Sequence, residues 1–318
     1  MNNHQNFNDS RELVTVIVSV FNRTDLIGAT LHSIQQQSYP NFECILVDDG
    51  SNEETIAVIQ NVIKDDTRFL FVKRPADRLK GANSCRNYGY EISKGQYINW
   101  FDSDDIMHPD FIQSKIEAIA DCEVAISKTC FFKEQITNVI GFEERTRLSE
   151  NLFEDFIRLK ISWYLPDPMW RKSFLVGKEL FRENLKKGQD RDFHTRMLLY
   201  KPSVKLVDKY VTYYRKHQET ITNSYSSEVI YSYFCALNEN IKLILKEHPS
   251  NDLKFFLLKM QVKNYKYLHR RKNSFFDFLK VFKTLFVFDY KNLRWFCKFL
   301  FAATLYNVVG KGDKVLKD

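Results

Sequence analysis

The sequence predicts an α/β fold, in which helices cover both faces of a mostly parallel β-sheet, followed by a C-terminal region that is entirely helical. Strand-like, β-branched runs alternate with segments of helical period up to residue 101, which is typical of parallel sheets. The chain has 318 residues, 44% of them apolar, so it can bury a sizeable core. From Ser224 onward we find only helical periodicity.

The alternating elements follow one another from residue 14. The run V-T-V-I-V-S-V, residues 14–20, is β-branched and bounded by polar residues, which predicts a strand. Apolar residues at 26, 27, 31 and 34 then have the spacing of a helix. By the same reasoning we expect strands at 42–47, 69–72 and 97–101, and helices at 53–64 and 81–93.

The order is looser after Pro109. A helix is expected up to Ala120, followed by strands at 124–132 and 136–142. Further helices are expected near 148–159, 171–177 and 190–199, and two short extended segments at 204–207 and 211–214. The helical region that follows has predicted boundaries near Pro249, Asn273 and Asp289.

Several classes of protein are excluded by simple patterns. The six cysteines include no C-x-x-C and no Cys/His pair at ligand spacing, which argues against a zinc site and a disulfide framework. The N-terminus has neither a basic nor an apolar segment of a signal peptide. The longest charge-free run of the tail, residues 299–310, is far shorter than the ~20 residues that span a bilayer. We expect a cytoplasmic protein without an ordinary membrane-spanning helix.

Acidic clusters follow two of the predicted strands. Asp48-Asp49-Gly50-Ser51 comes after the second strand, and Asp102-Ser103-Asp104-Asp105 after the fourth. Ligands of parallel sheets collect at the carboxyl ends of the strands. Carboxylates two residues apart on such a loop can share a divalent cation, although a turn with solvated acids is the simpler reading of an isolated D-x-D. A G-x-G-x-x-G fingerprint and a P-loop are both missing, which disfavours dehydrogenases and P-loop enzymes.

These motifs together resemble the inverting nucleotide-sugar glycosyltransferases of family 2, which have the GT-A fold. The resemblance rests on residues 14–23, 33–51, 81–89 (G-A-N-S-C-R-N-Y-G) and 95–109 (G-Q-Y-I-N-W-F-D-S-D-D-I-M-H-P), with fainter continuations at 189–197 and 213–217. It implies a disordered N-terminus at 1–11 and a GT-A domain at 12–223. In that domain, residues 12–110 would bind the nucleotide sugar and 111–223 the acceptor. The helical region is then 224–318.

The resemblance also implies roles for residues of the donor site. Val20, Asn22 and either Asp48 or Asp49 would hold the nucleotide base and ribose, and Arg86 would border the same pocket. The simpler interpretations are a plain turn with Ser51 as a helix N-cap, and for Arg86 a surface salt bridge.

A metal site is implied as well. Asp104 would be the main ligand of Mn²⁺ or Mg²⁺, while Asp102 would touch the ribose, or the metal through water. His217 would reach the diphosphate or the metal.

Inversion by single displacement needs a carboxylate base, for which the resemblance indicates Asp190. The family usually has Glu-Asp here, whereas this chain has Gln189-Asp190. Asp192 is the alternative base, and an N-cap is the structural alternative for Asp190. Because of Gln189, a catalytically inactive GT-A domain that serves as a binding or assembly subunit of a glycan-synthesis complex remains the second hypothesis. Trp163 and Trp170 would stack on sugar rings or lie in the core.

The tail is basic and aromatic. Residues 251–318 carry 15 Lys and Arg against 5 Asp and Glu, together with 16 aromatic residues. Helices of this composition favour an anionic membrane surface. A packed helical subdomain is the main alternative, and nucleic acid is the least favoured partner. We expect an enzyme peripheral to the cytoplasmic face of the inner membrane. It would transfer a sugar from a nucleoside diphosphate, most simply UDP, to a hydroxyl of a surface polysaccharide or lipid-linked glycan.

Overall fold

The computed structural model describes residues 12–216, 227–257, 259, 260, 297, 300, 301 and 304. The chain divides into two compact units. The first contains Met1–Leu152, Lys160–Glu183 and Lys201–Gln218, and the second Phe153–Leu159, Asn184–Tyr200 and Glu219–Asp318. Each unit is built around different elements.

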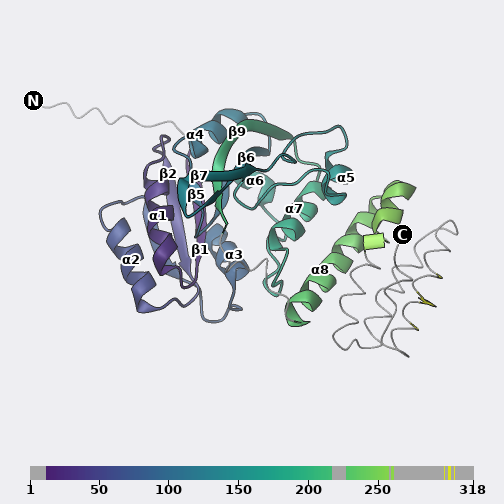
Figure 1. The fold of residues 1–318 in the computed structure, drawn as a ribbon, viewed down its shortest axis with the longest axis horizontal. Coiled ribbons are helices and arrows are strands. Elements are labelled where there is room, and N and C mark those ends of the chain that lie inside the picture. The colour runs from purple at the N-terminus through teal and green to yellow at the C-terminus, as the bar shows by residue number, and fades with distance from the viewer. Residues whose placement is uncertain are drawn as a thin grey trace, which may run out of the picture. The chain divides into compact units, whose positions relative to one another are not determined.

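The first unit begins with a parallel sheet whose strands were predicted from the sequence. β1 (Val14–Val20) lies between β2 (Phe42–Asp48) and β4 (Tyr97–Asp102), and β3 (Phe69–Lys73) pairs with β2. The connecting helices are α1 (Thr24–Gln35), α2 (Glu53–Ile63) and α3 (Ala82–Ile92). The predicted α/β class with a mostly parallel sheet is confirmed (Figure 1).

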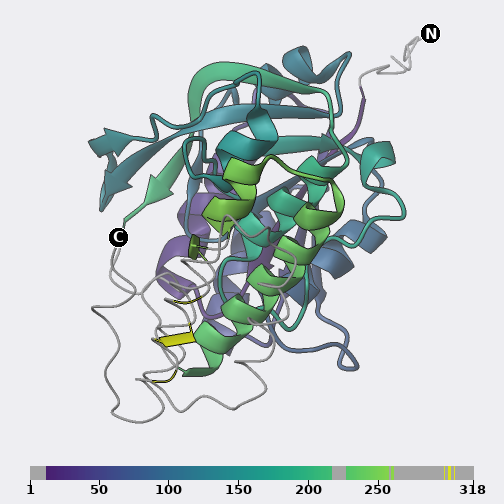
Figure 2. The same ribbon diagram turned by 90° about the vertical axis from the view of Figure 1, so that its right-hand side faces the viewer.

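Five more strands extend this sheet in the order β3-β2-β1-β4-β8-β6-β9-β5, with β7 paired to β6. They are β5 (Ile106–Met107), β6 (Val124–Lys133), β7 (Gln135–Phe142), β8 (Pro168–Arg171) and β9 (Val204–Arg215). α4 (Phe111–Ile119) and the short α6 (Lys172–Leu175) also belong to this unit. β9 runs beside β6 over most of its length (Figure 2).

The first unit differs from the prediction in three strands. The two extended segments at 204–207 and 211–214 are one strand, β9, which continues through the exposed Asp208 and Lys209 because β6 pairs with it on both sides of a register shift. β5 and β8 were not foreseen. Both are too short to show a strand pattern. β8 starts at Pro168, which has no backbone N–H, and the first residue of a strand does not need to donate a hydrogen bond to the neighbouring strand.

The core of the first unit lies on both faces of the sheet. Val16 and Val18 of β1 pack with α1 and α4 on one face, whereas Ile45 and Val47 of β2 pack with Cys85 of α3 on the other. Gly89 of α3 allows the helix to approach β1, because a Cβ there would lie 2.4 Å from the Ile17 side chain. This close packing fixes α3, and with it the residues that α3 presents at the carboxyl edge.

The described part of the second unit is helical. It contains most of α5 (Leu152–Ile157), α7 (Gln189–Leu199), α8 (Ser227–Lys246) and a helical segment at 251–257. The predicted boundary near Pro249 is confirmed, whereas those near Asn273 and Asp289 lie outside the described residues. α5 is shorter than the expected 148–159. Among the described residues, no helix is both long and apolar enough to span a bilayer.

Candidate active site

The carboxyl ends of three parallel strands meet at one edge of the first unit. In the register of the sheet, Val20 of β1 lies opposite Asp48 of β2, and Ser19 lies opposite Asp102 of β4. β8 is antiparallel to both β4 and β6, and β6 is parallel to β9, so the end of β9 at Arg215 faces the same way as the end of β4. The predicted acidic loops therefore share one edge of the sheet.

The loop after β2 is held by its own acids. The Asp48 carboxylate accepts hydrogen bonds from the backbone amides of Gly50, at 3.1 Å, and Ser51, at 3.1 and 3.2 Å. Gly50 adopts a φ of 88°, which favours glycine. The Asp49 carboxylate accepts a bond from Nε of Arg74 at 2.6 Å. Both carboxylates are buried, so this turn has a fixed conformation at the carboxyl edge of the sheet.

Asn22 connects the first loop to the second. Its side-chain oxygen accepts a bond from the Asn52 amide at 2.9 Å, and its own amide donates to Ser51 Oγ at 3.0 Å. Asn52, not the predicted Ser51, is the N-cap of α2, and its side chain accepts from the Thr55 amide. Asn22 has a φ of 47°, so the loop after Val20 turns sharply, and its two bonds fix it to the loop after β2.

Arg86 is buried, which corrects the alternative of a surface salt bridge. Its Nη2 donates to Oδ1 of Asp102 at 3.1 Å, and its Nη1 donates to Oδ1 of Asn83 at 3.1 Å. The guanidinium also lies 5.4 Å from the centre of the Phe181 ring. The structure thus brings together Arg86 and Asp102, two residues that the sequence singled out from separate motifs.

The loop after β4 contains three acids in different surroundings. Asp102 and Asp104 have side chains that are 29% and 20% exposed. Nε of Arg23 lies 3.6 Å from Oδ2 of Asp104. Asp105 is buried, and its Oδ1 accepts a bond from the Arg215 amide at 2.9 Å. Burial, with the neighbouring carboxylates of Asp104 and Asp102, raises the pKa of Asp105 well above its ordinary value.

Asp102 and Asp104 suit a hard divalent cation. Mg²⁺ and Mn²⁺ prefer oxygen ligands, and Mg²⁺ is commonly held by one or two carboxylates with substrate phosphates and water. The crowded negative charge that raises the pKa of Asp105 is what a cation would neutralise. In the described part of the chain, no group of three or more His, Cys, Asp or Glu side chains forms a complete metal site. His217, the further predicted ligand, lies outside the described residues.

Asp190 lies in the first turn of α7 in the second unit. The N-cap is Gly188, with a φ of 73°, so the N-cap alternative for Asp190 is wrong. An oxygen of its carboxylate accepts a bond from the Arg191 amide at 2.7 Å. Asp190 is only partly buried, so its carboxylate keeps some access to solvent.

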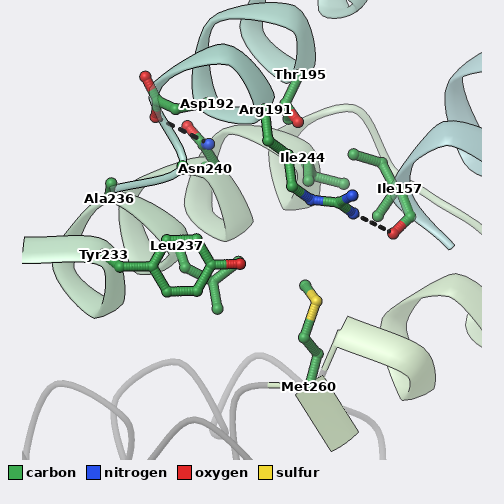
Figure 3. Close-up of a pocket in the computed structure, with 11 residues that line it drawn as sticks. Ile157, Arg191, Asp192, Thr195, Tyr233, Ala236, Leu237, Asn240, Ile244 and Met260 are labelled. Atoms are coloured by element: carbon green, nitrogen blue, oxygen red, sulfur yellow. Dashed lines mark hydrogen bonds between the residues drawn. The ribbon is translucent and has the colours of Figure 1, made fainter. Parts of the chain in front are cut away.

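Asp192 differs sharply from Asp190. It is buried and pairs with Arg196, whose Nη2 lies 2.7 Å from Oδ2. Its Oδ1 accepts a bond from the side chain of Asn240 in α8 at 3.0 Å (Figure 3). Asp192 thus contributes to the contact between α7 and α8. Trp163 and Trp170 are also buried and belong to the core.

The sequence did not indicate the basic partners of the acidic loops. Arg74 bonds Asp49 and Arg23 lies beside Asp104, whereas Arg215, at the end of β9, bonds Asp105 through its backbone amide and the Asp104 carbonyl through its Nε. Each of these arginines looks like an ordinary charged residue in the sequence, and only pairing of the strands brings it to the edge. The one signal in the sequence that could have indicated these arginines is that so many neighbouring acidic residues require positive charge nearby.

The comparisons with known proteins decide the family. Residues 15–198, more than half of the chain, match the model described as Glycosyl transferase family 2. The chain belongs to this family. The resemblance seen in the sequence is therefore confirmed, and the protein is a glycosyltransferase.

Two kinds of relative are informative. The glucosyltransferase WfaP of Escherichia coli, named UDP-Glc:alpha-D-GlcNAc-diphosphoundecaprenol beta-1,3-glucosyltransferase, is 29% identical over 226 residues, which cover 69% of this chain and 83% of WfaP. The crystal structure of S. aureus TarS 1-349 with UDP-GlcNAc matches with a TM-score of 0.62 at 16% identity, covering 86% of this chain and 80% of TarS 1-349.

A second structure, the mannosyltransferase PcManGT from Pyrobaculum calidifontis with GDP-Man and Mn²⁺, matches with a TM-score of 0.54 at 15% identity. It covers 87% of this chain and 75% of PcManGT. At such identities these structural likenesses concern the fold, and they confirm the GT-A class of this family 2 glycosyltransferase.

Proposed function

We propose that the protein transfers a sugar from UDP to a hydroxyl of a lipid-linked or surface glycan, with inversion at the transferred carbon. The observation that carries the proposal is the edge at which Asp48, Asp102 and Asp104 meet, within a chain that belongs to family 2. The activity for which WfaP is named supports both UDP as the nucleotide and a diphosphate-linked lipid as the acceptor.

For the donor, we propose that the loops after β1 and β2 bind the nucleoside. Val20 and Asn22 form one side and Asp48 and Asp49 the other. Because Asp48 and Asp49 already bond to the turn and to Arg74, their remaining oxygen lone pairs are what a base N–H or ribose hydroxyl would use. Preorganised acceptors of this kind bind a ligand without a further loss of side-chain entropy.

For the diphosphate, we propose that Asp104 holds Mn²⁺ or Mg²⁺, with Asp102 reaching the metal through water or bonding the ribose. A bound cation supplies charge neutralisation of the departing diphosphate. Arg86 keeps Asp102 oriented. When the diphosphate binds, the Arg23 guanidinium leaves Asp104 and bonds a phosphate oxygen instead. His217 is proposed as a further ligand to the diphosphate or metal.

For the acceptor, we propose Asp190 as the base that removes the proton from the attacking hydroxyl. It is more accessible than Asp192, whose carboxylate already bonds Arg196 and Asn240. A group that must accept a proton from substrate needs a free oxygen, and Asp190 meets this requirement better.

The test measures UDP release from UDP-glucose and UDP-GlcNAc with Mn²⁺, with and without a synthetic GlcNAc-diphosphate-lipid. We expect acceptor-dependent release by the wild type and none by Asp104→Asn. Asp121→Asn, at a side chain that is 88% exposed, is the matched control and should keep full activity. UDP-sugar binding without any turnover, over all donors and acceptors tried, would instead support the inactive binding subunit that Gln189 suggests.

A further inference from the structure

Three aromatic side chains form a cluster in the acceptor half of the first unit. They are Phe131 of β6, Tyr164 in the segment before β8, and Tyr214 of β9. Their ring centres are 5.8 Å apart for Phe131 and Tyr164, 6.0 Å for Phe131 and Tyr214, and 5.1 Å for the two tyrosines. All three are only partly buried. Aromatic residues of the core, such as Phe101 against Phe111, are fully enclosed instead.

The cluster lies next to the acidic loop after β4. β5, which leaves that loop, pairs with β9 so that Ile106 is opposite Tyr213. The next residue, Tyr214, is opposite Phe131 in the parallel pairing of β6 and β9. Arg215, the residue after Tyr214, donates its backbone amide to Oδ1 of Asp105 at 2.9 Å and its Nε to the Asp104 carbonyl at 2.9 Å. The rings and the candidate metal ligands therefore share one neighbourhood.

Charged groups surround the rings. The Tyr164 hydroxyl lies 3.5 Å from Oε2 of Glu143, a buried carboxylate that Arg145 holds through two hydrogen bonds. These bonds outweigh the effect of burial and lower the pKa of Glu143, so it remains an acceptor at neutral pH. The Lys216 ammonium lies 4.3 Å from the centre of the Phe131 ring and 4.6 Å from that of Tyr214.

This combination is what a pyranose ring requires. A sugar presents an apolar C–H face that packs on aromatic rings, and hydroxyls that bond carboxylates and ammonium groups. The pair formed by Phe142 of β7 and Tyr210 of β9, two strands that each pair with β6, has a similar ring contact, with centres 4.7 Å apart. It lies farther along β9 from the acidic loop, so it provides an internal comparison.

We propose that Phe131, Tyr164 and Tyr214, together with Glu143, form a subsite that binds a hexopyranose ring beside the diphosphate. The inference rests on the proposed function. The ring is either the sugar being transferred or the terminal sugar of the acceptor, and both offer the same chemistry. Lys216 covers the ring faces when no sugar is bound, and binding requires it to move toward a phosphate or a hydroxyl.

The experiment uses the full-length chain with four substitutions. Phe131→Leu and Tyr214→Leu remove a ring face but keep apolar volume, and Tyr164→Phe removes only the hydroxyl. Phe142→Leu, at a side chain that is 50% exposed, is the matched control. For each variant, calorimetry with Mn²⁺ gives Kd for UDP and for UDP-glucose and UDP-GlcNAc. Initial rates give KM for a synthetic GlcNAc-diphosphate-lipid.

We expect the two Leu variants to keep the UDP affinity of the wild type, which also shows that they fold. If the subsite holds the transferred sugar, their affinity for the UDP-sugar falls by about fivefold to tenfold, as expected for loss of one aromatic contact. If it holds the acceptor sugar, UDP-sugar affinity is unchanged and the acceptor KM rises by a similar factor. Tyr164→Phe should show a smaller change of the same kind.

Two results would overturn the subsite. One is Leu variants whose UDP-sugar affinity and acceptor KM both equal those of the wild type. The other is an equal loss of UDP and UDP-sugar affinity, which indicates damage to the nucleotide loops. Failure of the proposed function gives a different result from these two. In that case the wild type itself neither binds a UDP-sugar nor turns one over, and the proposed subsite is wrong as well.

Discussion

Nη2 of Arg86 in α3 lies 3.1 Å from Oδ1 of Asp102, the last residue of β4. The two residues come from separate motifs, and the approach of α3 to β1 at Gly89 brings them together. Arg86 has a second bond to Asn83, so its guanidinium is fixed before any ligand binds. A fixed cation at this point orients Asp102 and adds positive charge beside the proposed diphosphate.

Arg86→Met should therefore weaken nucleotide binding. The substitution keeps most of the apolar contact with Phe181 but removes the hydrogen bond that Arg86 donates to Asp102. We expect about a tenfold loss of UDP affinity with Mn²⁺, since a hydrogen bond to a charged group contributes about 1.5 kcal/mol or more. Calorimetric titration with UDP measures it. Arg78→Met, which breaks the more exposed pair with Glu91, is the control. Equal UDP affinity in Arg86→Met and wild type would remove Arg86 from the donor site.

Asp190→Asn and Asp192→Asn should fail in different ways. Loss of a general base costs about 10² to 10⁴ in turnover, so Asp190→Asn should keep donor affinity and thermal stability while kcat falls by this factor. Asp192 is buried with Arg196 and Asn240, and breaking a buried ion pair typically costs about 3 to 5 kcal/mol. Asp192→Asn should therefore lower Tm. Full turnover in Asp190→Asn, with loss of turnover in folded Asp192→Asn, would move the base by two residues.

The buried side chain of Asp167 in the first unit predicts a pH effect. Lys115 donates to Oδ1 of Asn99 at 3.0 Å and to the Pro166 carbonyl at 2.7 Å, and Asp167 accepts bonds from Thr129 and Tyr164. Burial raises the pKa of Asp167 from 3.8 to about 6, despite the hydrogen bonds and the charge of Lys115. The folded state thus binds the proton more tightly than the unfolded state does.

The stability that Asp167 contributes by holding its proton is present below pH ~4 and is lost as the pH rises through about 6. Asp167→Asn cannot titrate. The Tm of the wild type minus that of Asp167→Asn should fall between pH 4 and pH 7. The other carboxylates titrate in both proteins, so their contribution to the pH dependence of Tm cancels in this difference. A difference that is constant or rises over this range would show that the pKa of Asp167 is not raised.

The parallel part of the fold could be predicted because β1, β2 and β4 are buried on both faces. Burial on both faces requires continuous apolar, β-branched runs, and the runs at β1 and β2 are unmistakable. β9 was harder, since polar side chains at Asp208 and Lys209 look like a turn when the pairing with β6 is unknown. Short strands such as β8 depend on their neighbours for their existence and show no period of their own.

The acidic residues of the site could also be predicted, but their partners could not. Asp102 and Asp104 follow a strand at a spacing that itself indicates chemistry. Arg74 and Arg215 are 25 and 110 residues from the acids they bond, and only the sheet brings them there. Asp105 illustrates the limit. It is adjacent to Asp104 in sequence, yet it is buried behind the loop and performs a structural role with the Arg215 amide.

The composition of residues 251–318 leads to the last prediction, which concerns an anionic membrane surface. Most of these residues lie outside the described part of the chain, but their sequence combines a net charge of +10 with 16 aromatic residues. Each Lys or Arg near such a surface contributes about 1 kcal/mol, and this attraction is screened beyond a Debye length of ~8 Å at physiological salt. The full-length protein should co-sediment with vesicles containing phosphatidylserine at low salt, and be partly released at high salt.

Replacing four basic residues of the tail with Gln, namely Lys280, Lys283, Arg294 and Lys298, should lower binding to phosphatidylserine vesicles by more than about tenfold. Binding to neutral phosphatidylcholine vesicles, which rests on the aromatic residues, should change little. The control replaces four exposed lysines elsewhere, Lys64, Lys94, Lys209 and Lys246, and so removes the same net charge. If both variants lose binding equally, attraction is a property of the whole protein's net charge. If the wild type ignores phosphatidylserine vesicles even at low salt, the basic tail serves another purpose, such as packing as a helical subdomain.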